Sequence, residues 1–261
     1  MRQILLLEKR QVNKIVVNNN KIKIDDSNIL FNDNEIIFNE SGNYLIEYVN
    51  SSDIKLEFVI KNVNVNLLEY SFDEKITVEN KYTVDHGSLR VDKFYNNERV
   101  KEKITIDLCS YNDKVDYYFS NICRCEEYYT MDINHKNKNT FSNISNKSIA
   151  LKNSKLDFII NSNVGKKCNG SVLDQNTRIV TMGECDTRIS PNMFIDLEDV
   201  TARHGSVVGT FKEDQLFYLM SKGISYYDSL KLLIKGYLLA NINVNLELRQ
   251  KILNIIDVYW R

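Results

Sequence analysis

Residues 201–225 read TARHGSVVGTFKEDQLFYLMSKGIS, and within this stretch the character of the chain changes. Before it, the chain is a long series of strand-like segments. After Gly209 the apolar residues follow a helical spacing, because Leu216, Leu219 and Met220 stand at positions i, i+3 and i+4. Gly223 is well placed as the C-terminal cap of that helix. The stretch therefore predicts the end of a β region and a helix over residues 212–222.

The region upstream, from residue 3 to about residue 208, consists of short β-favouring bursts separated by polar turns. Each burst is one strand long, many alternate apolar with polar residues, and nothing between them sustains a helical period. Typical bursts are ILLL (4–7), KIKI (21–24), YLIEYV (44–49) and KITIDL (103–108). The turns are built from Asn, Asp, Ser and Gly, which suit tight corners. This region is predicted to be all β.

Two architectures fit such a pattern of strands and corners. A β-solenoid buries a continuous core by stacking similar coils, at repeats of roughly 20 residues or more. A β-sandwich fits the pattern about equally well, because no exact repeat can be read in the sequence. The strand pattern alone leaves these two alternatives open.

Two further helices are predicted after the first. Ser225 and Asp228 form a capping-box-like S-x-x-D ahead of an apolar stripe. A third helix is expected from about Asn245, and its predicted apolar face contains Leu248, Ile252, Ile255 and Ile256. We expect the three helices to cover the end of the β region, since the last coil of a solenoid leaves an unpaired edge.

Composition argues against several classes of function. The 261 residues include 34 basic and 35 acidic side chains, so no general charge attracts nucleic acid. The N-terminal apolar run is too short for a signal peptide, and the apolar stretch 230–242 is interrupted by Lys231 and Lys235. The odd set of five cysteines favours reduced thiols over disulfides. We therefore expect a cytoplasmic protein with no membrane or nucleic-acid partner.

The junction at residues 201–225 resembles the signature of the SufB/SufD family, in which a His-Gly pair closes the last rung of a β-helix and a helix reading roughly DEDQLFYLRSRGI follows. His204 and Gly205 supply the pair. The helix positions are matched by Glu213, Asp214, Gln215, Leu216, Phe217, Tyr218, Leu219, Ser221, Gly223 and Ile224. Residues 133–158, with His135, Thr140, Ser142, Lys147 and Leu151, and residues 191–205 are similar to further rows of the family.

This resemblance implies a fold and a function. It favours a right-handed parallel β-helix over residues 1–209, followed by a C-terminal helical module over residues 210–261 that docks an ABC ATPase. It also implies a short form without the helical N-terminal domain of longer members, since strand-like bursts begin almost at Met1. The family members are scaffold subunits for iron-sulfur cluster assembly, so the chain is expected not to be an enzyme.

Family membership further implies partners and a cargo. Two related scaffold subunits pair through their β-helices, each carries a SufC-like ABC ATPase, and a transient iron-sulfur cluster forms between them. No G-x-x-x-x-G-K-[ST] motif occurs, so no nucleotide is expected to bind this chain by that route. Residues expected to contact the ATPase are Glu213, Gln215, Phe217, Tyr218 and Lys222.

The candidate ligands of the cluster's iron are His204 and Cys185. A neutral imidazole can ligate iron, and histidine in place of thiolate gives a more labile site. Gly205 after His204 is typical of the SufD type. Cys185, six residues before Pro191, instead resembles the cluster cysteine of the SufB type. The sequence therefore leaves open a SufD-like subunit paired with a SufB-like one, or a SufB-like homodimer.

Other candidate residues have simpler interpretations. Cys123 and Cys125 form a C-x-C that could bind metal, but adjacent inward-facing residues of one strand explain it better. Structural roles are also expected for Cys109, Cys168, His86 and His135. A solenoid enzyme acting on carbohydrate is an alternative that would need converging carboxylates, and Asp196, Glu198 and Asp199 alternate poorly for that purpose.

Overall fold

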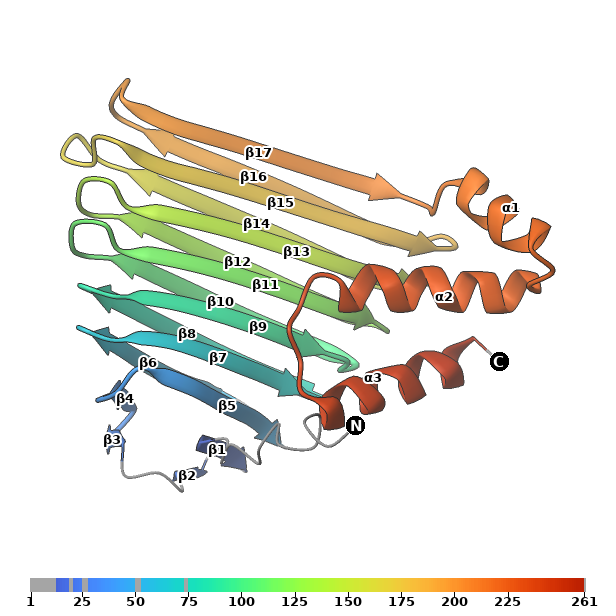
Figure 1. Cartoon of the computed structure of the whole chain (residues 1–261), viewed down its shortest axis with the longest axis horizontal. Helices are drawn as coiled ribbons and strands as arrows, with labels where there is room; N and C mark the ends of the chain where they lie inside the picture. The colour runs from blue at the N-terminus through green and yellow to red at the C-terminus, as the bar shows by residue number, and fades with distance from the viewer. Residues whose placement is uncertain (1–12, 19–20, 25–27, 50–52, 73–74, 261) are drawn as a thin grey trace, which may run out of the picture.

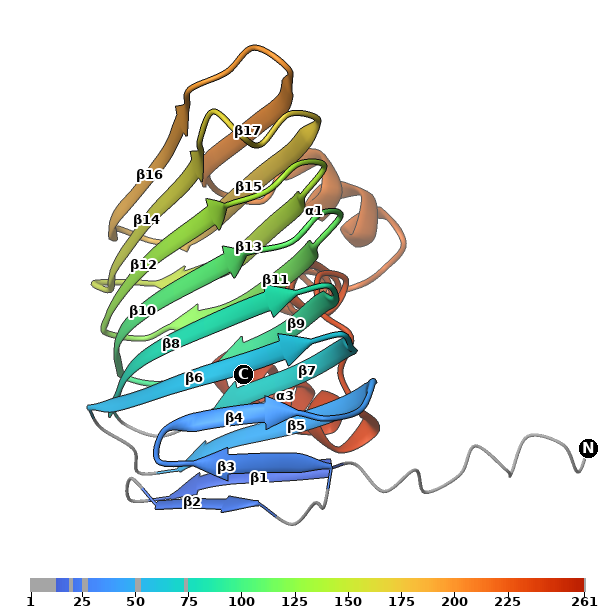
Figure 2. The same cartoon turned by 90° about the vertical axis from the view of Figure 1, so that its left-hand side faces the viewer.

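A computed structural model of the chain describes residues 13–18, 21–24, 28–49, 53–72 and 75–260. Most of them form two facing β-sheets (Figures 1 and 2). Sheet A contains β1 (Asn13–Asn18), β2 (Lys21–Ile24), β5 (Gly42–Val49), β7 (Asn64–Ser71), β9 (Ser88–Tyr95), β11 (Lys114–Cys123), β13 (Phe141–Leu151), β15 (Ser171–Met182) and β17 (Val200–Gly209). Sheet B contains β3 (Ile29–Asn32), β4 (Glu35–Phe38), β6 (Ile54–Lys61), β8 (Lys75–Asp85), β10 (Arg99–Leu108), β12 (Glu126–His135), β14 (Lys155–Val164) and β16 (Asp186–Ile195).

From β4 onward the chain alternates between the sheets, so each coil contributes one strand to sheet A and one to sheet B. Like strands of successive coils pair in parallel, which confirms the β-solenoid and makes the sandwich alternative wrong. Val65 pairs with Leu89, whereas Ser142 pairs with Leu173. The coil therefore lengthens from 24 residues (89 − 65) to 31 (173 − 142), which explains why no exact repeat is readable.

The interior between the sheets is filled by the inward-facing residues of each strand, in rows that run from coil to coil. Aromatic rings stack along these rows, as do Phe58 with Tyr82 and Tyr129 with Phe158, each pair at 4.9 Å between ring centroids. The corners turn through left-handed residues, as the polar turn signals predict. This conformation occurs in the successive corners at Asn62, His86, Asn112, Asn139 and Gly170.

The N-terminal end of the solenoid is closed by two antiparallel pairs. β2 folds back on β1, and β3 folds back on β4, so short strands of four residues stand at this edge of each sheet. Short edge strands limit pairing with other chains. The predicted burst at residues 4–7 lies outside the described residues.

The three helices begin and end close to their predicted positions. They are α1 (Glu213–Ser221), α2 (Tyr226–Leu239) and α3 (Leu246–Tyr259). The Ser225 side chain accepts a hydrogen bond from the Asp228 amide at 3.1 Å, which confirms Ser225 as the cap of α2, and Asn245 caps α3 in the same way. Gly223, at φ +83°, follows α1 as expected.

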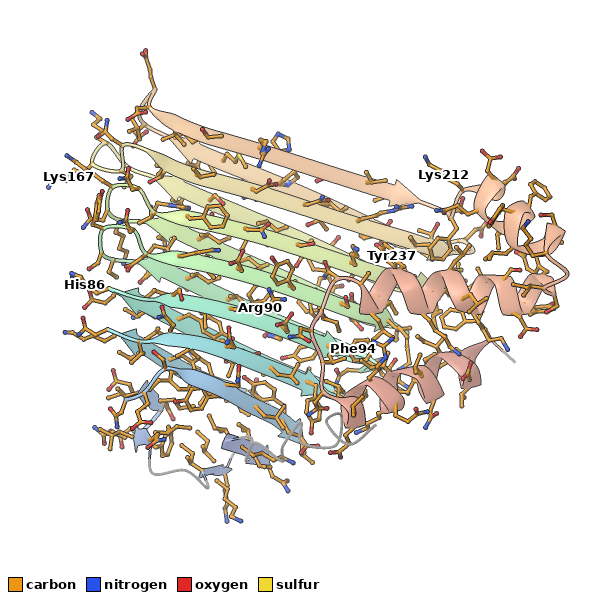
Figure 3. The ribbon with its side chains drawn as sticks, viewed as in Figure 1. His86, Arg90, Phe94, Lys167, Lys212 and Tyr237 are labelled. Carbon is orange, nitrogen blue, oxygen red and sulfur yellow. The ribbon has the colours of Figure 1, made fainter. Side chains whose placement is uncertain are left out.

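The helices do not cover the end of the solenoid, and this prediction was wrong. They lie along the outer face of sheet A (Figures 1 and 3). The outward-facing residues Phe94, Ile122, Ile149 and Val180 are apolar near the ends of their strands, and they form one buried cluster with the helices. Asn241, just after α2, donates to the backbone oxygens of residues 119 and 145. The helices therefore bury the apolar stripe on sheet A, which is favourable in free energy, and leave the edge strands of the last coil uncovered.

Candidate functional site

The C-terminal end of the solenoid is an uncovered coil formed by β16 and β17. Each strand has ten residues, and no described strand pairs with its outer edge. Large apolar side chains are exposed here, including Phe194 at 57% and Val207 at 52%. A long edge with exposed apolar residues is a surface on which another chain can add a strand. We call β16 and β17 the open end.

His204 lies in the middle of β17, on the open end. It pairs in register with Gln175 of β15, which in turn pairs with Ile144 of β13. Gln175 and Ile144 are buried in the interior, and paired residues of parallel strands face the same side. The imidazole therefore belongs to an interior row, yet His204 is exposed because no further coil lies above it. It is a nitrogen ligand presented at an uncovered surface.

Cys185 lies in the turn between β15 and β16 and is half-buried. Its thiol donates to backbone oxygens, at 3.2 Å to Leu151 and at 3.4 Å to Ala150 and Gly183. The side chain also packs against the main core. These contacts hold the Cys185 thiol against the chain's own backbone, so its side chain would have to rotate toward solvent to bind iron.

The structure does not bring His204 and Cys185 together within one chain. Cys185 lies beside Leu151, whereas His204 is in register with Gln175 and Ile144. At about 3.3 Å per residue, the seven residues between positions 144 and 151 span roughly 23 Å. One small cluster therefore cannot bind both side chains of the same subunit, and each would need ligands from another chain.

The C-x-C pair does not lie on one face of a strand, so its interpretation as two adjacent inward-facing residues was wrong. β11 ends at Cys123, which is buried, while Cys125 is exposed in the following turn. Burial raises the pKa of the Cys123 thiol, which disfavours the thiolate that a metal needs. Across the described parts of the chain, no group of three or more His, Cys, Asp or Glu residues could hold a metal ion.

The remaining histidines have contacts that suit structural roles. His135 is buried, with its ring nitrogens 2.7 Å from the Thr140 hydroxyl and 2.9 Å from the Ser142 hydroxyl. Burial lowers the pKa of His135 to about 4. His86 occupies a left-handed corner, where Nδ1 lies 2.8 Å from Asp85 Oδ1. Figure 3 labels His86 at the corner opposite the helices.

Helix α1 buries none of its residues and packs mainly on α2. All five residues predicted to contact the ATPase are exposed: Glu213, Gln215, Phe217, Tyr218 and Lys222. Phe217 and Tyr218 are 62% and 63% exposed. Two tyrosines that the sequence analysis did not single out, Tyr226 and Tyr227 at the start of α2, are also exposed. We call these four exposed rings the α1 patch.

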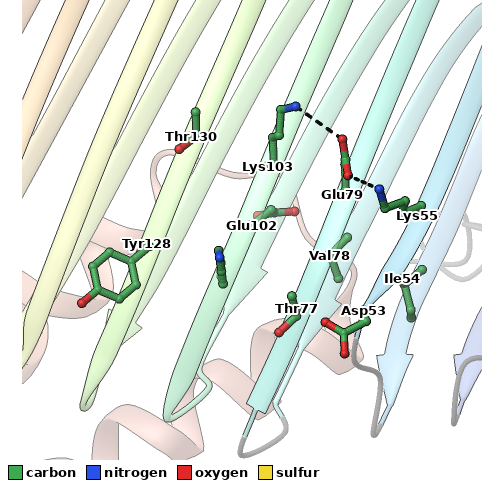
Figure 4. A pocket seen from close by; sticks show the side chains of 11 residues that line it. Asp53, Ile54, Lys55, Thr77, Val78, Glu79, Glu102, Lys103, Tyr128 and Thr130 are labelled. Atoms are coloured by element: carbon green, nitrogen blue, oxygen red, sulfur yellow. Dashed lines mark hydrogen bonds and ion pairs between the residues drawn. The ribbon is translucent and has the colours of Figure 1, made fainter.

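A pocket of about 330 Å³ lies elsewhere, on the outer face of sheet B (Figure 4). Glu79 forms ion pairs there with Lys55 at 3.0 Å and Lys103 at 3.4 Å. These paired side chains satisfy one another on a solvent-exposed sheet. Asp196, Glu198 and Asp199 are exposed in the turn after β16. Neither place brings an unpaired acid and base together in the way that glycoside cleavage requires.

A cluster that the sequence analysis missed lies deep in the interior. Lys93 contacts Glu102 and lies 3.0 Å from Glu69, and all three side chains are almost fully enclosed. Lys93 and Glu69 interrupt the apolar alternation of β9 and β7. That interruption was the only signal in the sequence.

None of the helices among the described residues combines the length and the apolar character that crossing a membrane demands.

Comparison with known proteins identifies the family of the segment that carries these features. Residues 124–237 match the model of the SUF system FeS cluster assembly, SufBD core domain. This segment runs from the turn after β11 through the open end and α1 into α2. It therefore contains Gln175, Cys185, His204 and the α1 patch.

Similarity to curated relatives covers part of the chain. The iron-sulfur cluster assembly protein SufD of Escherichia coli is 32% identical over 71 residues, which are 27% of this chain and 16% of that protein. SufD of Bacillus subtilis is 37% identical over 71 residues, with the same shares. A SufBD family protein of Staphylococcus haemolyticus is 30% identical over 106 residues, covering 40% of this chain and 23% of that protein.

These matches span less than a quarter of each relative's length, and they agree with the SufB/SufD resemblance of the signature. The solenoid and its open end agree with it as well. Residues 124–237 match the SufBD core domain, and over this segment the chain is similar to iron-sulfur cluster assembly proteins of the SufBD family.

Proposed function

We propose that this chain is a SufD-like scaffold subunit of a SUF-type complex, which holds a nascent iron-sulfur cluster at an interface between two solenoids. The observation that carries the proposal is the position of His204, on an interior row of the uncovered last coil. A ligand placed there faces whatever covers the open end. The role is that of a cytoplasmic scaffold and not of an enzyme.

The partner at the open end is a second β-helix, either a SufB-like subunit or another copy of this chain. Two ten-residue strands offer their backbone groups to a partner strand. Strand addition satisfies those groups, and burial of Val207 and Phe194 adds hydrophobic stabilisation. At the closed N-terminal end, the described edge strands β2 and β3 have only four residues each.

The ATPase partner binds the α1 patch. A SufC-like ABC ATPase would cover Phe217 and Tyr218, with Glu213, Gln215 and Lys222 at the rim. Exposed aromatic side chains on a helix are typical anchors for a partner's groove. The α1 patch follows the end of β17 in the chain and lies near it (Figure 1). Binding of the ATPase at the patch could therefore influence the scaffold interface at the open end.

The cluster is cargo, held by His204 and by ligands of the facing subunit. Cys185 is the second candidate ligand, acting at a separate position about 23 Å along the same coil. The same cysteine supports the alternative of a SufB-like homodimer. In either arrangement the ligands of one cluster come from both chains.

Co-expression with a SufC-like ATPase and a SufB-like subunit, followed by purification and anaerobic reconstitution with iron and sulfide, tests the proposal. The matched variants are His204→Ala, Cys185→Ala and the double variant, with His86→Ala as the control. We expect cluster absorbance to fall with His204→Ala and to be retained with His86→Ala. Failure to bind any such ATPase, or cluster loading unaffected by the double variant, would show that the proposal is wrong.

A further inference from the structure

Gln175 crosses the interior of the solenoid one coil below His204. It lies on β15 of sheet A and is only 1% exposed. Its Nε2 donates to Ser162 Oγ of β14 at 2.6 Å and to the backbone oxygen of Asn192 of β16 at 3.4 Å. The amide therefore links sheet A to sheet B just beneath the open end.

These two contacts determine which way the amide points. An amide nitrogen donates and an amide oxygen only accepts, so a flipped amide would set its oxygen against the Asn192 carbonyl. The nitrogen must face sheet B. Oε1 is then left buried without a hydrogen-bond partner. A buried acceptor without a partner is costly, so a donor that comes within reach is strongly favoured.

His204 is the neighbour of Gln175 in the same row. The two residues are partners in the parallel pairing of β15 with β17, and their side chains leave the sheet on the same face. His204 is exposed in the free chain, so its imidazole is not held by packing against a further coil. Gly205, beside it, adds no side chain to the strand.

We propose that Gln175 is a positioning residue for His204: its Oε1 accepts the N–H of the imidazole and directs the other ring nitrogen toward the open end. This inference rests on the proposed function of His204 as a cluster ligand. A histidine that ligates metal commonly donates its other N–H to a carbonyl or carboxylate, which selects the tautomer and orients the ring. Gln175 would supply that acceptor from within the chain's own interior.

The arrangement also explains a polar residue at this depth. Further down the same row, Ile144 and Val91 are apolar and buried, and Tyr117 between them is a buried aromatic residue whose hydroxyl also has no hydrogen-bond partner. The Gln175 amide donates across the interior to sheet B, and its Oε1 remains available to accept from His204 on the last coil. Asn146 is a useful contrast, because it is another buried amide of the interior and its oxygen is also unpartnered. Its row leads through Thr177 to Ser206 and not to His204.

The test uses the full chain labelled with ¹⁵N-histidine, whose three imidazoles are assigned by loss of signal in His204→Ala. The variants are Gln175→Met, which keeps length and removes both amide groups, and Gln175→Glu, which keeps an acceptor oxygen. Asn146→Leu is the matched control, and circular dichroism checks that each variant is folded. Two-bond ¹H–¹⁵N spectra give the tautomer ratio, and a Zn²⁺ titration followed at the His204 signals gives its affinity.

We expect Gln175→Met to change the tautomer ratio of His204 about fivefold, the effect of one net hydrogen bond. Zn²⁺ binding at His204 should weaken about 10-fold, as for other residues that orient a metal-binding histidine. Gln175→Glu should keep the wild-type tautomer when its buried carboxyl is protonated, because the O–H then donates toward sheet B and the other oxygen still accepts. Asn146→Leu should keep the wild-type values. An unchanged tautomer ratio in folded Gln175→Met, or the same change in Asn146→Leu, overturns the inference. So does a changed ratio with unchanged Zn²⁺ affinity.

If Gln175→Met does not fold, Gln175→Leu takes its place with the same expected results, and loss of the wild-type tautomer ratio in Gln175→Glu also overturns the inference. These outcomes are independent of the proposed function. A scaffold that never loads a cluster but shows the Gln175-dependent tautomer and Zn²⁺ affinity contradicts only the proposed function. A scaffold that loads its cluster with a Gln175-independent tautomer contradicts only the present inference.

Discussion

Lys93 and Glu102 form an ion pair that is completely enclosed between the two sheets, and Glu69 lies on the other side of the same ammonium group. Two carboxyl groups thus share one cation. Burial raises the pKa of the Glu102 carboxyl. The cluster joins β7, β9 and β10, so it holds sheet A and sheet B together near the middle of the solenoid.

Removing the central cation should destabilise the fold strongly. Lys93→Ala leaves two buried carboxyl groups without their partner, and we expect a loss of about 3–5 kcal/mol in the free energy of unfolding. Lys103→Ala is the control, since Lys103 pairs with Glu79 on the exposed face and should cost less than about 1 kcal/mol. Urea denaturation measures both. Equal losses for the two variants would contradict the role assigned to the buried cluster.

Glu127 should make the stability of the protein fall as the pH rises. Its Oε2 accepts from Asn121 at 2.5 Å and from the Tyr129 hydroxyl at 2.7 Å, while Oε1 has no partner. Burial is the main cause that raises the pKa of Glu127 to about 7. The folded state therefore favours the protonated form. Its contribution is fully present below the pKa of the unfolded chain, near 4.5, and is lost as the pH rises through about 7.

The isosteric variant Glu127→Gln tests this pH dependence. A rise in the Glu127 pKa from 4.5 to about 7 corresponds to roughly 3 kcal/mol, so the variant should be more stable than the wild type by up to that amount at pH 8. At pH 4 the two proteins should be similar. Urea midpoints between pH 4 and pH 8 give the comparison. Parallel curves for the two proteins would show that Glu127 does not titrate in this range.

The open end should lose its partner when its edge is charged. Val207→Lys places an ammonium on an exposed position of β17, and lysine on an edge strand disfavours strand addition. We expect the dissociation constant of the scaffold pair to rise at least about tenfold. Sedimentation velocity of the purified pair measures it. Leu30→Lys is the control, because Leu30 is 54% exposed at the closed end and should have no effect on pairing.

The α1 patch should dominate the affinity for the ATPase. Truncation of Phe217 and Tyr218 to alanine removes two exposed rings from a helix that contributes nothing buried to the core. We expect binding to weaken at least about tenfold while thermal stability stays unchanged. Calorimetry with a SufC-like ATPase provides the affinity. Leu246→Ala on α3, at an 86% exposed position, is the control and should bind like the wild type; the same loss in both variants would contradict the assignment.

Much of the fold could be predicted from local signals. Strand-length bursts, Asn-rich corners and helix caps are encoded within a few residues of one another, and the cap at Ser225 and the start of the third helix at Asn245 were confirmed. The placement of the helices could not be predicted in this way. Ile122, Ile149 and Val180 look like parts of ordinary buried runs, and only the register shows that they face outward beneath α2 and α3.

In the candidate site, too, residues of a contiguous motif could be predicted, whereas neighbours from different coils could not. His204 was found because the motif around it is contiguous, whereas Gln175 was missed because it is a neighbour across one coil. Ser142 pairs with Leu173, and Leu173 pairs with Ala202, so successive coils there differ in length, at 31 residues (173 − 142) and 29 (202 − 173). A reader of the sequence has no fixed period with which to locate the residue below His204. Cys125 was misplaced because β11 ends two residues earlier, at Cys123.

The closure of the N-terminal end by β1–β2 and β3–β4 also governs how far assembly can proceed. A solenoid with two long bare edges could add subunits head to tail without limit and grow into fibres. Among the described residues, one end offers two ten-residue edge strands, and the strands at the other end are folded back in antiparallel pairs. Association through the bare end uses up the only pair of long edges among the described strands. In the proposed complex, growth would then stop at two solenoids, and a single cargo would lie between them.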